Sequence, residues 1–165
     1  MLEKENNLPV NVHSRTGKNN PRIPLRFEIY ADRSEYVAGE AILLRALLLN
    51  LSSDDLVVNG RLLVNRPEDI HEVSLTVTEP NGKKLPLIAR INAGKPQSTD
   101  LRTLAPFECV GRLLHLQLYY RLSQRGEYTV HAEYSNSWKG VKGKSTPWIG
   151  TLESNDVKFA VVKKR

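Results

Sequence analysis

The stretch Leu122-Ser-Gln-Arg-Gly-Glu-Tyr-Thr-Val-His-Ala-Glu-Tyr134 carries the strongest fold information in the chain. A glycine turn at Gly126 leads into a strict alternation of apolar and polar residues. One face of the alternation holds Tyr128, Val130, Ala132 and Tyr134. A period of two is that of a strand with one face in the core and the other in solvent. The stretch therefore predicts a half-buried antiparallel β-strand.

Similar short runs, separated by turn residues, continue on both sides of this stretch. The run from Glu40 to Asn50 is rich in leucine, so a helix competes with a strand there. Gly39 before it and Ser52–Asp55 after it favour the strand. Many short strands with frequent turns are typical of a sandwich or a barrel. We predict strands near residues 25–30, 40–50, 73–79, 112–120, 126–134 and 154–162.

Two Asn-Gly pairs predict β-hairpins, because both residues of such a turn accept a positive φ. Asn59-Gly60 would join residues 56–58 to residues 61–64, and Asn81-Gly82 would join residues 73–79 to residues 83–85. Tyr36-Val-Ala-Gly39 reads as a turn before the leucine-rich strand. The polar stretch 88–103 is predicted to cross between sheets.

Length and charge suit a single basic domain. A chain of 165 residues can bury roughly two-thirds of the surface of its unfolded form. The net charge of +6 favours acidic partners, or it serves only solubility. Residues 1–24 are polar and lack an apolar period, so they are predicted to be a flexible arm before a domain at 25–162. Residues 163–165 form a basic end.

Features that would fix a compartment or a disulfide framework are missing from the sequence. Cys109 is the single cysteine, so no intrachain disulfide can form, and we expect it to pack as a small apolar residue. The N-terminal residues do not read as a secretory signal. The localisation is therefore unknown: inside the cell, or outside it if a signal has been removed. No apolar run is long enough for a membrane span.

No catalytic, metal-binding or cofactor-binding constellation is found in the sequence. His71 precedes Glu72, but no second histidine follows at helical spacing. His115 and His131 lie on neighbouring predicted strands, either as a close pair or as two exposed side chains. No nucleophile elbow and no phosphate-binding loop is present. We therefore expect a protein that is not an enzyme and needs no cofactor.

The segment Asn136-Ser-Trp-Lys-Gly-Val-Lys-Gly-Lys-Ser-Thr-Pro-Trp148 is the best candidate for a partner-binding loop. Rigid aromatic rings beside cations are typical of recognition surfaces. The alternative is a hairpin in which the two tryptophans pack across the strands. The candidate contact residues are Trp138, Lys139, Lys142, Lys144 and Trp148.

At Gly126-Glu-Tyr128 the chain resembles the tyrosine corner of an immunoglobulin-type sandwich, in which a tyrosine hydroxyl ties back to the preceding loop. It is more similar still to the disulfide-free Ig-like modules of bacterial secreted and envelope proteins. Their phrases correspond here to Tyr36–Glu40, Leu104–Pro106, Tyr119–Leu122, Gly126–Tyr128 and Gly150–Asn155. The order of these phrases also resembles the β-sandwich that precedes deuterolysin-like metalloprotease domains. Phe107 departs from the pattern, since a glycine normally follows the proline.

This resemblance implies an all-β, Ig-like antiparallel β-sandwich of about seven to nine strands. It also implies a secreted or envelope location if a signal has been removed. The expected function is a non-enzymatic binding or structural module that contacts a protein or a glycan. The alternative is a protease-inhibitor or protease-associated sandwich. Nucleic acid is not expected as a partner, and a monomer and an edge-strand dimer both stay open.

Overall fold

The fold is all-β, as the sequence predicts. The computed structural model describes residues 23–66, 72–91 and 94–163. Within these ranges it contains ten strands and two short 3-10 helices. Most of the predicted N-terminal arm and the last two residues of the basic end lie outside the described residues.

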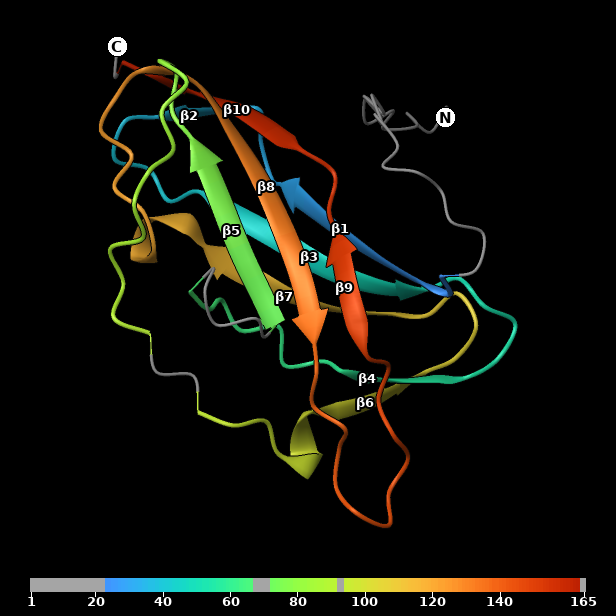
Figure 1. The fold of residues 1–165 in the computed structure, drawn as a ribbon. Coiled ribbons are helices and arrows are strands. Elements are labelled where there is room, and N and C mark those ends of the chain that lie inside the picture. The colour runs from blue at the N-terminus through green and yellow to red at the C-terminus, as the bar shows by residue number, and fades with distance from the viewer. Residues whose placement is uncertain (1–22, 67–71, 92–93, 164–165) are drawn as a thin grey trace, which may run out of the picture.

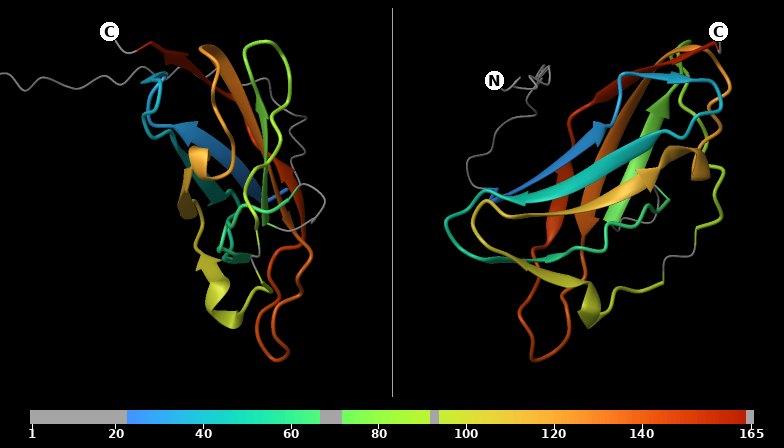
Figure 2. Two further views of the ribbon diagram at one scale, coloured as in Figure 1. Left: turned by 90° about the vertical axis from the view of Figure 1, so that its left-hand side faces the viewer. Right: turned by 180° about the vertical axis from the view of Figure 1, so that it is seen from behind.

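Two sheets lie face to face as the layers of a sandwich (Figures 1 and 2). The first sheet has the order β1-β3-β7 and is antiparallel throughout. The second has the order β2-β10-β8-β5, with β9 paired to the far end of β8. A small third sheet joins β4 to β6. The elements are β1 (Leu25–Ala31), β2 (Glu35–Val37), β3 (Leu43–Asn50), β4 (Leu56–Asn59), β5 (Glu72–Thr78), η1 (Ser98–Asp100), β6 (Leu101–Leu104), β7 (Cys109–His115), η2 (Leu116–Leu118), β8 (Gly126–Asn136), β9 (Gly150–Glu153) and β10 (Val157–Val162).

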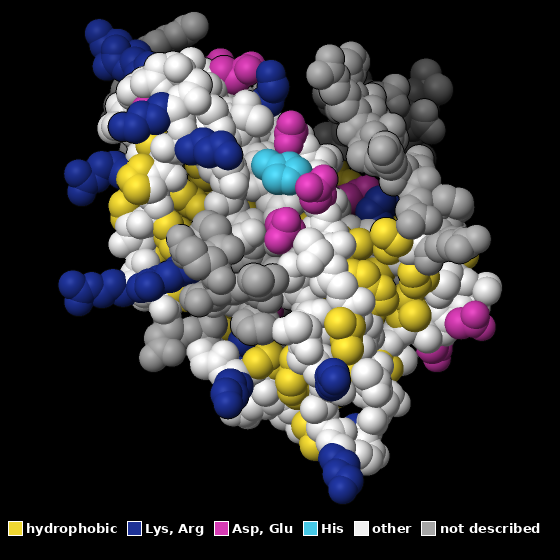
Figure 3. Space-filling model, in the orientation of Figure 1, with side chains coloured by type: hydrophobic (Ala, Val, Ile, Leu, Met, Phe, Trp, Pro, Cys, Tyr) yellow, Lys and Arg dark blue, Asp and Glu magenta, His cyan; other side chains and the backbone are white. Residues whose placement is uncertain are grey.

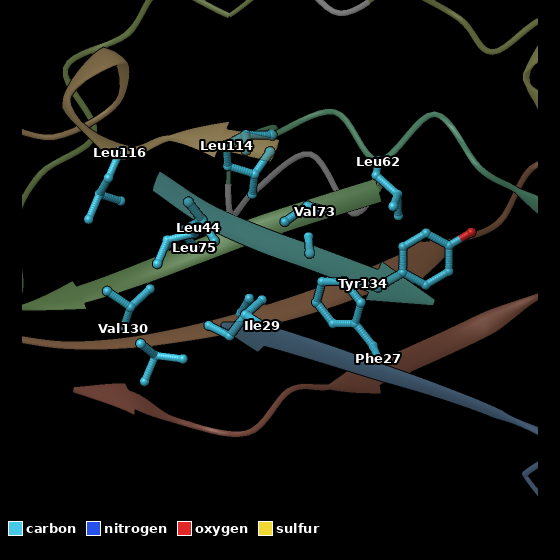
Figure 4. Packing of buried hydrophobic residues seen from close by; sticks show 14 of the residues in the cluster. Phe27, Ile29, Leu44, Leu62, Val73, Leu75, Leu114, Leu116, Val130 and Tyr134 are labelled. Carbon is cyan, nitrogen blue, oxygen red and sulfur yellow. The ribbon is translucent and has the colours of Figure 1, made fainter. Parts of the chain in front are cut away.

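The core fills the space between the two main sheets, as Figure 4 shows. Phe27 and Ile29 of β1 face Val130 and Tyr134 of β8. The predicted alternation is confirmed on β8, where Tyr128, Val130, Ala132 and Tyr134 are all buried. Each large apolar side chain buried in this way contributes about 1.5–3 kcal/mol of transfer free energy.

The leucine-rich run is a strand, not a helix. Leu44, Ala46 and Leu48 point inward with 0% exposure, and the residues between them point outward. β3 pairs with β1 on one side and with β7 on the other, so its backbone groups are satisfied between neighbouring strands. This pairing resolves the ambiguity that the leucine-rich composition left open.

The predicted tyrosine tether at the start of β8 is present. The Tyr128 hydroxyl donates to the carbonyl oxygen of Gln124 at 2.8 Å and accepts from the Gln124 amide at 2.9 Å. The Tyr128 ring is stacked on Phe159, with 5.6 Å between ring centroids. Burial raises the pKa of Tyr128, which favours the protonated hydroxyl that donates this bond. Gly126 opens the strand beside Pro80.

The hairpin predicted at Asn59-Gly60 is wrong. Residues 56–59 form β4, which pairs with β6, far along the chain, and not with residues 61–64. Arg61 turns away from β4 because its guanidinium binds the carboxylate of Glu72. The Asn-Gly dipeptide permits a turn, but the long-range pairing and the ion pair decide where the chain goes.

The turn at Asn81-Gly82 is confirmed, with a different geometry. The Gly82 amide donates to the Glu79 carbonyl at 2.8 Å, and the Glu79 amide donates to the Lys83 carbonyl at 2.9 Å. Only Gly82 has a positive φ, of 85°. A type I turn followed by one left-handed residue has this pattern. The expectation that both residues would take positive φ is therefore wrong.

The strand predicted over residues 112–120 ends early. Beyond its end, the side chain of Gln117 makes the hydrogen bonds to the neighbouring segment that the backbone of a longer strand would make. β7 stops at His115, and η2 then turns Leu118 outward, to 61% exposure. The Gln117 side chain accepts from the Ile42 amide at 3.0 Å and donates to the Glu40 carbonyl. Leu116 and Tyr120 are nevertheless buried.

Three smaller expectations are also corrected. The predicted turn at Tyr36–Gly39 begins as β2, which pairs in parallel with β10. Cys109 is exposed instead of packed, since it lies on the outer face of β7. Sequence reasoning missed β9 and took the polar stretch 88–103 for a plain crossover, although η1 and part of β6 lie within it.

We expect Tyr128→Phe to lower the free energy of unfolding by about 1 kcal/mol, because the Gln124 backbone groups lose a buried partner. Urea denaturation followed by circular dichroism measures the change. Tyr119→Phe is the matched control, since no hydrogen bond of the Tyr119 hydroxyl is found in the described part of the chain. An equal effect of the two substitutions would contradict a structural role for the tether.

Candidate binding loop

The Trp/Lys loop, residues 137–149, connects β8 to β9 and projects from the bottom of the sandwich in Figure 1. The strands pair up to its base, where Asn136 lies opposite Gly150. All five candidate contact residues lie on this loop. Its far end leads into β9, which precedes the last strand, β10.

A buried asparagine closes the base of the loop. Asn136 is 3% exposed, and its side-chain amide nitrogen donates to two carbonyl oxygens. One belongs to Trp138 at 3.1 Å, the other to Trp148 at 2.7 Å. Because one amide group holds both ends, the loop leaves and re-enters the sheet at fixed positions.

Trp148 fixes the returning end of the loop against the core. Its ring is stacked on Tyr134, with centroids 6.3 Å apart, and its amide donates to the Val57 carbonyl at 2.7 Å. A Cβ atom at Gly150 would lie 2.6 Å from the indole. Only glycine therefore allows the ring to lie over this backbone. Trp148 is therefore a packing residue, which is the role that the alternative prediction gave to both tryptophans.

Trp138 differs from Trp148 in its contacts. It is half-buried, and its carbonyl is held by Asn136. Among the described residues, the ring contacts join Trp148 to Tyr134, and none joins the two indoles. The alternative prediction, that both tryptophans pack across the strands, is therefore met by Trp148, whereas no ring contact of Trp138 is found among the described residues. Trp138 keeps part of its ring surface in solvent.

The tip of the loop is cationic and turned to solvent. The Lys144 amide donates to the Val141 carbonyl at 3.0 Å, which closes a β-turn. Lys139, Lys142 and Lys144 are exposed, and none of them belongs to an ion pair in the part of the chain that the structure describes. These three charges are available to an anionic partner.

A buried polar network lies near the base of the loop. The Tyr134 hydroxyl donates to the Asn59 carbonyl at 2.9 Å. Glu72, 2% exposed, binds Arg61 and accepts from the Leu63 amide at 2.8 Å. Burial, and next to it the negative charge of Glu72, raise the pKa of Tyr134, so its hydroxyl stays a donor. The sequence analysis did not predict this network, because its members lie far apart along the chain.

The other sequence predictions fare differently. His115 and His131 lie in different sheets, and His131 pairs with Asp156 at 2.9 Å. β8 is not an edge strand, since it pairs with β5 on one side and with β10 and β9 on the other. Within residues 23–66, 72–91 and 94–163, no group of three potential ligands could hold a metal ion. Across the same ranges, no helix is long and apolar enough to cross a membrane.

Comparison with known proteins returns no family model and no curated protein that matches this chain.

We expect Trp148→Ala to destabilise the fold more than Trp138→Ala. Truncating a tryptophan that is packed against the core costs about 3 kcal/mol. Loss of Trp138, for which no ring contact is found among the described residues, should cost about 1 kcal/mol. Urea denaturation of the two variants measures the difference. An equal loss of unfolding free energy in the two variants would contradict the conclusion that Trp148 is packed and Trp138 is not.

Proposed function

We propose that the chain is a non-enzymatic, Ig-like binding module that uses the Trp/Lys loop to contact an anionic protein or glycan. The strand order supports the Ig-like assignment. β5, β8 and β10 follow the order of strands C, F and G of such a sandwich, and β1, β3 and β7 follow that of A, B and E. The tether from Tyr128 to Gln124 supports it further.

One observation carries the binding role: the loop has a fixed base and a charged, exposed tip. Asn136 and the stacked Trp148 hold the base, while Lys139, Lys142 and Lys144 extend into solvent. A loop ordered before binding loses less conformational entropy when a partner arrives. This arrangement favours recognition over a simple connection between strands.

The chemistry of the tip favours a partner with several negative charges. Three lysines on one loop attract carboxylates or sulfates, and the attraction weakens as salt screens the charges. The partly exposed Trp138 offers apolar surface beside them, suited to a sugar ring or an aliphatic side chain. A sulfated glycan and an acidic peptide both meet these requirements.

We expect dextran sulfate to bind the protein and unsulfated dextran not to bind, because the lysines need an anion. In a Trp148→Phe background the fluorescence of Trp138 alone reports the contact. Lys139→Glu with Lys142→Glu should weaken binding by about 1.4 kcal/mol or more, a tenfold rise in Kd. A polyglutamate peptide replaces the glycan in a parallel titration.

The matched control is Arg45→Glu with Lys158→Glu, which changes the net charge equally at exposed sites away from the loop. An equal loss in the two double variants would assign the binding to general charge and overturn the role of the loop. The protease-inhibitor alternative remains a prediction, and an inhibition assay with purified proteases tests it.

A further inference from the structure

A strained turn displays an aromatic ring at the end of the sandwich that lies on the right in Figure 1. Residues 105–108 form a β-turn in which the Glu108 amide donates to the Ala105 carbonyl at 3.0 Å. Phe107 is the third residue of this turn and has a φ of 63°. That position of a type II turn normally holds glycine, because a Cβ atom is strained there. The Phe107 side chain is nonetheless 74% exposed.

The turn is held firmly in place. The buried amide of Asn50 donates to the carbonyls of Asp54, Leu104 and Ala105. The Phe107 amide donates to the Asn50 carbonyl at 2.9 Å, and the Glu108 carboxylate accepts from the Ala105 amide at 2.8 Å. The ring of Phe107 is therefore presented on a rigid support. Phe107 lowers the stability of the turn because of its positive φ, and its side chain is not part of the buried core.

Phe107 belongs to an apolar patch with an acidic rim. Leu51 is near Phe107, because it follows Asn50, whose carbonyl accepts from the Phe107 amide. The Leu51 amide in turn donates to the carbonyl of Pro24 at 2.7 Å, and Ile23 precedes Pro24 in the chain. Ile23 and Leu51 are 41% and 38% exposed. Figure 3 shows apolar and acidic side chains at this right-hand end. We call this surface the Phe107 end: Ile23, Leu51, Pro106 and Phe107, with Asp54, Asp55 and Glu108 around them.

The opposite side of the sandwich carries the complementary surface. Residues 80–91 and 116–126 contain no acidic residue. They lie together, since the Ile88 amide donates to the Tyr119 carbonyl at 2.9 Å. Ile88 is 51% exposed and Leu118 61%. Figure 3 shows cationic side chains along this left margin. We call it the cationic edge: Ile88 and Leu118, with Lys83, Lys84, Arg90, Arg121 and Arg125.

Charges on both surfaces are left without ionic partners inside the molecule. The ion pairs among the described residues include none of the three acids of the Phe107 end and none of the five cations of the cationic edge. Each surface combines exposed apolar side chains with charges of a single sign, and the two signs are opposite. Complementary potentials of this kind guide association and set its orientation.

We propose that the Phe107 end of one molecule binds the cationic edge of a second copy. The ring of Phe107 would lie against Ile88 and Leu118, while the acids of the rim meet the lysines and arginines. Because the two surfaces differ and lie on opposite sides, the contact is heterologous and repeats from copy to copy. The association is a head-to-tail chain that dissociates as salt is added. It is independent of the Trp/Lys loop.

Sedimentation velocity over a concentration series tests this assembly. The wild-type protein should form dimers and longer species as concentration rises, and added salt should reverse this. Phe107→Gly should raise the Kd of association at least about tenfold, equivalent to about 1.4 kcal/mol. The same substitution should raise the thermal unfolding midpoint, because glycine relieves the strained turn. A folding defect therefore cannot explain the loss.

A mixing experiment establishes the direction of the contact. Phe107→Gly keeps the cationic edge, and Lys83→Glu with Lys84→Glu keeps the Phe107 end, so each variant alone should be monomeric. Their mixture should form a dimer with one molecule of each variant and no longer species. Leu113→Ser, an exposed leucine outside both surfaces, and Lys139→Glu with Lys142→Glu should both associate like the wild type.

Four results would overturn the proposal. A wild-type protein that stays monomeric at every concentration would exclude association between copies through the Phe107 end. Association that survives both Phe107→Gly and the Lys83/Lys84 variant would assign it to another surface. A closed dimer that each variant still forms by itself would exclude a head-to-tail arrangement. Loss of association in the Lys139/Lys142 control would assign the contact to the Trp/Lys loop.

Discussion

Hydrogen bonds from buried tyrosine hydroxyls fix the positions of the strands and loops relative to one another in this protein. A tyrosine ring adds much apolar area to a core, but its hydroxyl must find a partner there. Tyr120 donates to the Leu75 carbonyl at 2.6 Å, Tyr134 to the Asn59 carbonyl and Tyr128 to the Gln124 carbonyl. Each bond ties a core side chain to the backbone of another segment. Burial raises the pKa of Tyr120 to about 12, so its hydroxyl stays a donor at neutral pH.

Asparagine side chains supply the hydrogen-bond partners of backbone groups that no neighbouring strand satisfies. Asn155 accepts from the Ile29 amide and donates to the Ile29 carbonyl, both at 2.9 Å, and so acts like a neighbouring strand on the free side of β1. Asn50 and Asn136 each hold carbonyls of two chain segments at one point. The Trp/Lys loop begins at Asn136, and the turn of the Phe107 end is held by Asn50. Rigid presentation, at the Trp/Lys loop and at the Phe107 end, thus follows from the same kind of contact.

Sequence patterns predicted the features that depend on local periodicity. The buried face of β8 follows from alternation, whereas the tether at Tyr128 was expected from the resemblance to a tyrosine corner. The sequence could not reveal that β4 pairs with β6, that Gln117 replaces a strand, or that Glu72 is buried against Arg61. Each of these depends on segments distant in sequence. The loop was found by its composition, but the different roles of Trp138 and Trp148 depend on Tyr134 and Gly150, which only the fold places beneath one indole.

Amide hydrogen exchange across residues 136–150 is the most direct test of a loop with a fixed base and a free tip. The Trp148 amide, bonded to Val57, should exchange nearly as slowly as the amides of β8. The amides of Lys139 and Lys142 should exchange fast, and dextran sulfate should slow them while leaving Trp148 unchanged. Fast exchange at Trp148 would mean that the base is not held. Slow exchange at Lys139 and Lys142 without a ligand would mean that the tip is packed instead of presented.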